Sequence, residues 1–139
     1  MEETRYGLRV DVDMPYDEAI VRVTDALKQE GFGVLTTIDV QQTLRHKLNR
    51  DFRRYVILGA CNPVLADRAL HVELEIGLLL PCNVIVYERE PGHSSVAAMA
   101  PVPAMTLVGK PELTAVAEEA DRRLRSALSR LEHGQGVVA

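Results

Sequence analysis

The longest regular pattern in the chain lies near its C-terminus, and it limits the fold more than any other feature. Apolar residues recur there at helical spacing between Pro111, which suits the first turn of a helix, and Gly134, which suits the end of one. About 22 residues at about 1.5 Å each give a helix of roughly 33 Å, which is long enough to cover a whole sheet. The apolar positions of this predicted helix are Leu113, Val116, Ala117, Ala120, Leu124, Ala127, Leu128 and Leu131.

Five segments before this helix have the periodicity or composition of β-strands. Residues 6–13 alternate between apolar and polar side chains, which is the period of a strand buried on one face. Residues 55–60 form a continuous apolar run, as expected of a strand buried on both faces. Pro91 and Gly92 predict a turn that joins two strands into a hairpin. The predicted strands are residues 6–13, 33–38, 55–60, 84–88 and 95–100.

Three shorter helices are predicted from the residues at their ends. Asp39, with Gln42 three residues later, is a capping-box-like pair that opens a short helix. Asn62 is a good N-cap, and Pro63 is a good first helical residue. The predicted helices are residues 15–30, 39–48 and 63–72, and we expect Val40, Leu44 and Leu48 to form the inner face of the second one.

These elements predict one sheet with helices packed on it. The hairpin is antiparallel, so we expect the sheet to be mixed, and Pro101 and Pro103 predict an extended link before the last helix. A chain of about this length buries roughly two-thirds of its unfolded surface. We therefore expect a single domain over residues 1–139, with a core at about 5–132 and a short flexible tail at 136–139.

The charge and the hydropathy exclude some classes of protein. The net charge of −4 argues against a dedicated nucleic-acid-binding protein, which presents a basic face to phosphates. The densest basic cluster, Arg50, Arg53 and Arg54, is either a solvated turn or a small anion site. The longest apolar stretch, residues 76–86, falls far short of the roughly 20 residues that a membrane-spanning helix needs. Because the N-terminus also has no targeting pattern, we expect a cytoplasmic protein with neither a nucleic-acid nor a membrane partner.

Two Cys-Asn blocks carry a resemblance to a known family. One block follows the apolar run 55–60, and the other follows the three leucines at 78–80. Over roughly residues 5–131 the sequence resembles the bacterial and archaeal family catalogued as domain of unknown function 302. The resemblance implies an α+β two-layer sandwich, with helices packed on a single mixed, largely antiparallel sheet of about five strands. It also implies a homodimer, but no activity and no catalytic residues. The positions that match the family signature are Cys61, Asn62, Pro63, Pro81, Cys82 and Asn83.

The candidate site is built on Cys61, Asn62, Cys82 and Asn83. Cys61 lies between a strand end and a helix N-terminus, where the helix dipole and unpaired N–H groups stabilise a thiolate. The alternative interpretation is a buried thiol that only packs, since free cysteine is often fully buried. If the strands that carry Cys61 and Cys82 are neighbours, the two thiols and the two amides would meet at one edge of the sheet. No pair of cysteines has the spacing of a zinc site, so no metal is predicted.

Three functions follow from these residues. The first is a binding module for a small molecule or an unidentified cofactor, with its site at the two Cys-Asn turns. The second is a structural or interaction homodimer whose thiols are buried. The third is a thiol-dependent redox enzyme, with Cys61 as the thiolate and Cys82 as its resolving partner. Common motifs for nucleotide binding, acyl transfer and zinc-dependent hydrolysis are absent, so the sequence leaves open whether the protein is an enzyme.

Overall fold

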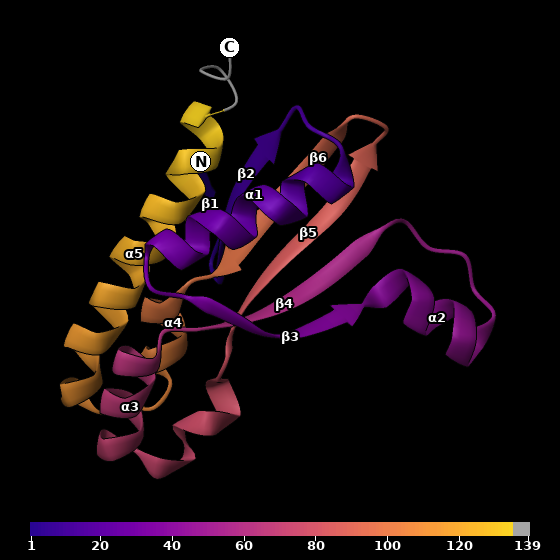
Figure 1. Cartoon of the computed structure of the whole chain (residues 1–139). Helices are drawn as coiled ribbons and strands as arrows, with labels where there is room; N and C mark the ends of the chain where they lie inside the picture. The colour runs from indigo at the N-terminus through magenta and orange to yellow at the C-terminus, as the bar shows by residue number, and fades with distance from the viewer. Residues whose placement is uncertain (135–139) are drawn as a thin grey trace.

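A computed structural model describes residues 1–134 of the chain, which form one six-stranded sheet with helices packed on it (Figure 1). The flexible tail predicted at residues 136–139 lies outside the described residues. In chain order the elements are β1 (Glu2–Glu3), β2 (Gly7–Val12), α1 (Tyr16–Gln29), β3 (Gly33–Asp39), α2 (Val40–Leu48), β4 (Tyr55–Cys61), α3 (Pro63–Val72), the 3₁₀ helix η1 (Leu74–Leu79), β5 (Cys82–Glu90), β6 (His93–Met99), α4 (Pro101–Thr106), the 3₁₀ helix η2 (Pro111–Leu113) and α5 (Thr114–Gly134).

The strands lie in the order β1-β2-β6-β5-β4-β3, and each strand is antiparallel to its neighbours. The predicted α+β class, with one largely antiparallel sheet and helices packed on it, is confirmed. The sheet is not mixed as expected, because every pair of neighbouring strands in the described chain is antiparallel. The strand missing from the prediction is β1, whose Glu2 and Glu3 pair with β2. No described helix is both long and apolar enough to cross a membrane.

The inner face of the sheet, which the helices cover, carries the core. Val10, Val96, Val86 and Val56 lie opposite one another across β2, β6, β5 and β4, and all four are buried. Figure 1 shows α1 lying across this face, and α5 packs against both α1 and β2. The predicted apolar face of the C-terminal helix is confirmed, because Leu113, Val116, Ala117, Ala120, Leu124, Ala127, Leu128 and Leu131 are all buried.

Glu30 ties the C-terminal end of α1 to α5, and this contact predicts a pH dependence of stability. Its carboxylate accepts hydrogen bonds from Arg130 Nη2 at 2.8 Å and from Ser126 Oγ at 2.7 Å. These bonds, that of Arg130 foremost, lower the pKa of Glu30 below its usual value. A lowered folded-state pKa stabilises the protein above the unfolded-state pKa of about 4.3, and this stability is lost as the pH falls through the folded-state pKa.

We therefore expect Glu30→Gln to lower the free energy of unfolding at pH 7 by about 1–2 kcal/mol, as for a charge-assisted hydrogen bond. The difference between wild type and variant should shrink as the pH falls below 4, and urea titrations at several pH values measure it. A difference that stays constant from pH 7 to pH 3 would contradict this account.

The predicted extended link at Pro101 and Pro103 is wrong, because these residues open the short helix α4. Ala100 is the N-cap, so the two prolines occupy the first turn of the helix. The N–H groups of a first turn have no partner within the helix, and a proline that lacks one is tolerated there. α4 places Met105 in the core, against α5.

The short helix α2 forms where it is predicted, but its predicted inner face is not buried. Asp39 Oδ1 accepts a hydrogen bond from Gln42 N at 2.9 Å, which confirms the cap. No residue of α2 is buried, however, and Leu48 is 62% exposed. Figure 1 shows the reason: α2 lies at the far end of β3 and β4, away from α1, α3 and α5.

Candidate functional site

A pocket lies where the ends of β4 and β5 meet the start of α3. Its volume is about 30 Å³. The walls are mostly apolar and come from many elements, with Phe32 before β3, Leu65 and Ala69 on α3, Met105 on α4, and Val116 and Ala120 on α5. The residues with polar side-chain atoms in the lining are Cys61, Asn62 and Cys82.

The sheet register explains how these three residues meet. β4 and β5 are neighbours, and Ala60 lies directly opposite Cys82. Cys61 is the last residue of β4, and Asn62 follows it as the N-cap of α3. The chain reaches Cys82 through Pro81, which also lines the pocket. Two segments about 20 residues apart in the sequence therefore share one cavity wall, which is the arrangement expected of neighbouring strands.

Asn83, the fourth predicted site residue, is not part of this pocket. It pairs with Gly59 and is exposed, whereas Cys82 beside it is buried. Successive side chains of a strand point to opposite faces of a sheet, so Cys82 and Asn83 cannot both face the pocket.

The two thiols have different surroundings. Cys82 is buried, whereas Cys61 is partly exposed. Burial raises the pKa of the Cys82 thiol to about 11, and the proximity of Cys61 adds to this rise. Cys82 is therefore a neutral thiol at pH 7, so it is a weak hydrogen-bond donor and not a charged group.

Asn62 is one of the few buried polar residues of the described chain, at 8% exposed. Its Oδ1 accepts a hydrogen bond from Leu65 N at 3.2 Å, which caps α3. Its Nδ2 lies against the backbone of Gly31, only 2.9 Å from the position that a Cβ of that residue would take. Gly31 has a φ of +87°, so glycine suits this position both for its backbone and for the space it leaves to Asn62.

The Nδ2 group of Asn62 has no hydrogen-bond acceptor within residues 1–132. Buried amide donors are nearly always paired in folded proteins, so an unpaired one calls for an explanation. Here the unpaired donor belongs to a residue that lines the pocket. The site thus combines apolar walls, two thiol groups and one hydrogen-bond donor that has no acceptor among the described residues.

The other predicted polar clusters do not converge on a site. Arg54 lies 5.8 Å from the centre of the Tyr16 ring and pairs with Asp17, whereas Arg53 donates to Glu88 O at 3.2 Å. These two guanidinium groups therefore have separate partners, so they do not form the small anion site with Arg50. In the described part of the chain, no group of three or more His, Cys, Asp and Glu side chains is placed to hold a metal ion.

The sequence pointed to Cys61, Asn62 and Cys82, but it missed most of the walls. Phe32, Leu65 and Met105 were not among the predicted site residues. These residues come from separate elements, and only the three-dimensional arrangement brings them together. For Phe32 the available signal was its position after Gly31, which turns the chain at the end of α1.

Similarity to known proteins extends over almost the whole described chain. Residues 8–131 match the protein family described as Domain of unknown function DUF302. A crystal structure of an uncharacterized conserved protein DUF302 from Bacillus stearothermophilus has a TM-score of 0.84 and is 36% identical, covering 92% of this chain and 99% of its own. No curated protein matches the sequence. The family match runs from β2 to α5 and so includes every element that lines the pocket.

Proposed function

Because the chain belongs to the family described as Domain of unknown function DUF302, which has no assigned activity, we propose from the site that it binds a small uncharged molecule in the pocket beside Asn62. The unpaired Nδ2 donor of Asn62 carries this proposal. A buried donor without a partner costs about 1–3 kcal/mol. An acceptor atom of a bound molecule removes this cost, so the site favours molecules that have one.

The walls restrict the ligand further. Phe32, Leu65 and Met105 line the same pocket with apolar surface, and an unpaired charge is strongly disfavoured against such walls. The cavity of about 30 Å³ is far smaller than the roughly 300–1,000 Å³ of pockets for drug-sized ligands. The enclosed part therefore accepts only a few heavy atoms, either a whole small molecule or the end of a larger one. A carbonyl or sulfoxide oxygen with methyl groups beside it fits both the donor and the walls.

The burial of Cys82 supports a binding role over the redox hypothesis. A resolving cysteine has to attack the oxidised sulfur of its partner as a thiolate, and a pKa of about 11 leaves almost no thiolate at pH 7. In the binding hypothesis Cys82 is a polarisable wall residue, and that role requires the neutral thiol.

Acetone and isobutene test the proposal, because they have nearly the same shape and only acetone has an acceptor. We expect acetone to shift the methyl resonances of Leu65 and Met105 in a saturable NMR titration. The matched variant is Asn62→Asp, which keeps the oxygen that caps α3 and removes the donor. One lost hydrogen bond of about 1.4 kcal/mol corresponds to an about tenfold higher Kd for acetone.

Isobutene is the control, and its binding should differ little between wild type and Asn62→Asp. Thermal unfolding of both proteins would show that the variant is folded. Equal acetone affinity in the two proteins would contradict the role of Asn62, and no saturable shift with any small acceptor would contradict the proposed function.

A further inference from the structure

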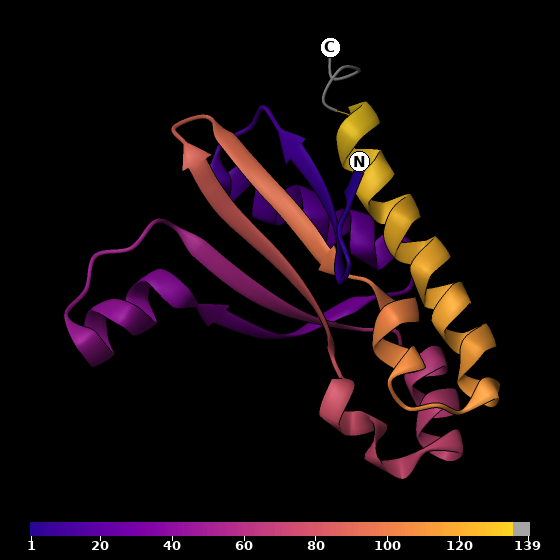
Figure 2. The same cartoon turned by 180° about the vertical axis from the view of Figure 1, so that it is seen from behind.

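The pocket beside Asn62 gathers much of the sulfur of the chain. The sequence has two cysteines and four methionines, and both cysteines and Met105 line this one cavity. Cys61 ends β4, Cys82 begins β5, and α4 carries Met105. Figure 1 and Figure 2 show why these distant segments meet, because α3, α4 and α5 lie together at the end of the sheet where β4 stops and β5 starts. Two thiols and one thioether therefore share a cavity of about 30 Å³.

The two thiols lie close enough to influence each other. Ala60, directly before Cys61, pairs with Cys82 across β4 and β5, and neighbouring strands lie only about 4.8 Å apart. The proximity of Cys61 contributes to the raised pKa of Cys82, so a negative charge on one sulfur is felt by the other. A positive ion held between the two sulfur atoms would turn this mutual repulsion into attraction to a shared charge.

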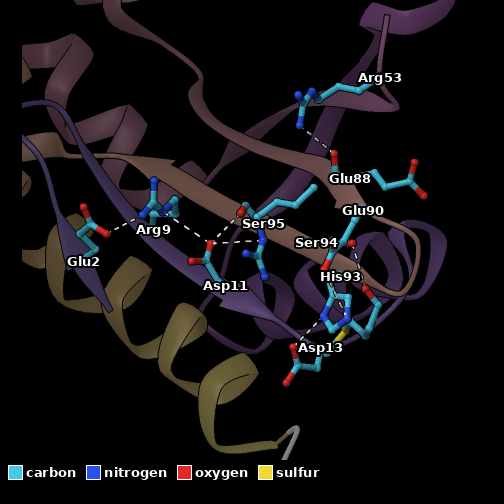
Figure 3. A network of polar contacts seen from close by, with 12 residues as sticks. Glu2, Arg9, Asp11, Asp13, Arg53, Glu88, Glu90, His93, Ser94 and Ser95 are labelled. Atoms are coloured by element: carbon cyan, nitrogen blue, oxygen red, sulfur yellow. Dashed lines mark hydrogen bonds and ion pairs between the residues drawn. The ribbon is translucent and has the colours of Figure 1, made fainter.

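The ligands that hard metal ions use lie elsewhere. Among the described residues that line the pocket there is no His, Asp or Glu, and Asn62 Oδ1 already accepts from Leu65 N. Figure 3 shows acidic side chains and His93 along β2, β5 and β6. The pair of His93 and Asp13, with 2.8 Å between Nδ1 and Oδ1, lies beside the opposite end of β5 from Cys82. The pocket therefore suits neither calcium, magnesium nor divalent copper, which prefer oxygen or nitrogen ligands.

Sulfur ligands select a different class of ion. Thiolates and thioethers bind soft ions such as monovalent copper, Cu(I), which is satisfied by fewer ligands than the four of a structural zinc site. The set of Cys61, Cys82 and Met105 is too small for zinc but suits Cu(I). A cavity needs roughly 10–15 Å³ to hold one water molecule, so about 30 Å³ is room for a single ion and little else.

The surroundings of the pocket also offset the charge of such a complex. A coordinated thiol loses its proton, so Cu(I) between two thiolates carries one net negative charge. Cys61 directly precedes Asn62, the N-cap of α3, and a helix N-terminus stabilises negative charge. Asn62 Nδ2 has no acceptor in the described part of the chain, and a thiolate in the same pocket is an acceptor that it lacks in the metal-free protein.

We propose that the pocket binds one Cu(I) ion through Cys61 Sγ and Cys82 Sγ, with Met105 Sδ as a third and weaker ligand. The ion leaves a soluble chelator and bonds to the sulfur atoms, and each thiol releases its proton to water. Copper stays monovalent, so nothing is oxidised or reduced. Cys61 is partly exposed and gives the ion its way in. The copper site does not rest on the proposed binding of an uncharged molecule, but the two would compete for one cavity.

Anaerobic titration of the full chain with Cu(I), in competition with the coloured chelator bicinchoninate, measures stoichiometry and affinity together. We expect the chain to retain a single Cu(I), and to bind Zn(II) and Co(II) at least about 100-fold more weakly. X-ray absorption at the copper edge should show sulfur as the nearest neighbour. The proposal would be overturned if the wild type lost its copper to the chelator at every concentration, or if the neighbours were nitrogen or oxygen.

Single substitutions separate the ligands from their packing role. Cys61→Ser and Cys82→Ser should each weaken Cu(I) binding at least about 100-fold, because a hydroxyl is a poor ligand for a soft ion. Met105→Leu keeps the volume of the side chain and removes the thioether, so we expect about tenfold weaker binding. Thermal unfolding checks that each variant is folded.

Met14→Leu is the matched control for Met105→Leu. Met14 is 3% exposed and Met105 is 6% exposed, but only Met105 lines the pocket. Met14→Leu should therefore bind Cu(I) as the wild type does. An equal loss of affinity in the two variants would mean that packing and not ligation was lost. Wild-type affinity in Met105→Leu would contradict the three-sulfur site.

Acetone locates the bound ion. The cavity is too small for both ligands, so acetone should no longer shift the methyl resonances of Leu65 in the copper-loaded protein. Unchanged acetone affinity after copper loading would place the ion outside the pocket and overturn the proposal. Met105→Leu should keep acetone binding, since its wall stays apolar. The chelator competition does not use acetone, so failure of the copper site and failure of the proposed function are distinguishable.

Discussion

Cys82 is expected to react with iodoacetamide more than about 100-fold more slowly than free cysteine at pH 8. The thiolate is the reactive form, and a pKa of about 11 leaves roughly one thiol in a thousand ionised at that pH, against about a quarter for a free thiol with a pKa near 8.5. Burial of the side chain slows the reaction further. Cys61 is partly exposed and should be labelled first.

Peptide-resolved alkylation of the folded protein measures both rates, and unfolding in urea should make them equal. The single variant Cys61→Ala isolates Cys82 and also removes the smaller of the two causes of its raised pKa. If Cys82 were labelled as fast as Cys61 in the native protein, the redox hypothesis, in which Cys82 is the resolving cysteine, would regain support. The description of Cys82 as an un-ionised thiol that lines the pocket would then be wrong.

Gly59→Ala is expected to lower the free energy of unfolding by about 2–3 kcal/mol, as for overpacking of a buried site. A Cβ at this position would lie 2.1 Å from Thr36 Oγ1 and 2.8 Å from Pro81 Cγ. Neither atom is the free end of a long side chain, so β3 or the turn before β5 has to move. Pro81 also lines the pocket, and we therefore expect the variant to weaken acetone binding as well.

Gly33→Ala is the matched control, because no atom lies within 4 Å of the added Cβ and the residue needs no left-handed backbone. Its stability should stay within about 0.5 kcal/mol of wild type. The double variant Gly59→Ala with Thr36→Ala should recover part of the loss, since it removes the closer of the two clashes. Equal stability of the Gly59→Ala and Gly33→Ala variants in urea unfolding would contradict this packing.

The local elements of the fold were predictable, because their signals are local. Asp39 and Gln42 determine where α2 begins, and Asn62 with Pro63 does the same for α3. The apolar face of α5 follows from its spacing alone. Pro101 was misjudged because a proline permits both an extended link and a first helical turn, and the choice depends on Met105 reaching the core.

Contacts between distant segments were not predictable in the same way. The order of the strands, with β6 between β2 and β5, depends on long-range pairing that no local pattern specifies. The meeting of Cys61 with Cys82 was predictable only on the condition that their strands are neighbours. The position of Asn83 outside the pocket follows from a local rule, because neighbouring side chains of a strand, here Cys82 and Asn83, point to opposite faces of the sheet. The homodimer was implied only by the family resemblance, and it stays a prediction.

The most direct test of the account is the side-chain amide of Asn62 itself, observed by ¹H–¹⁵N NMR during a titration with acetone. We predict that the Nδ2 proton resonances move downfield and saturate with the same Kd as the methyl shifts of Leu65 and Met105, because the donor gains an acceptor. Methyl shifts without any change at Asn62 would mean that the molecule binds without this hydrogen bond. No change at any of the three residues would contradict the binding function.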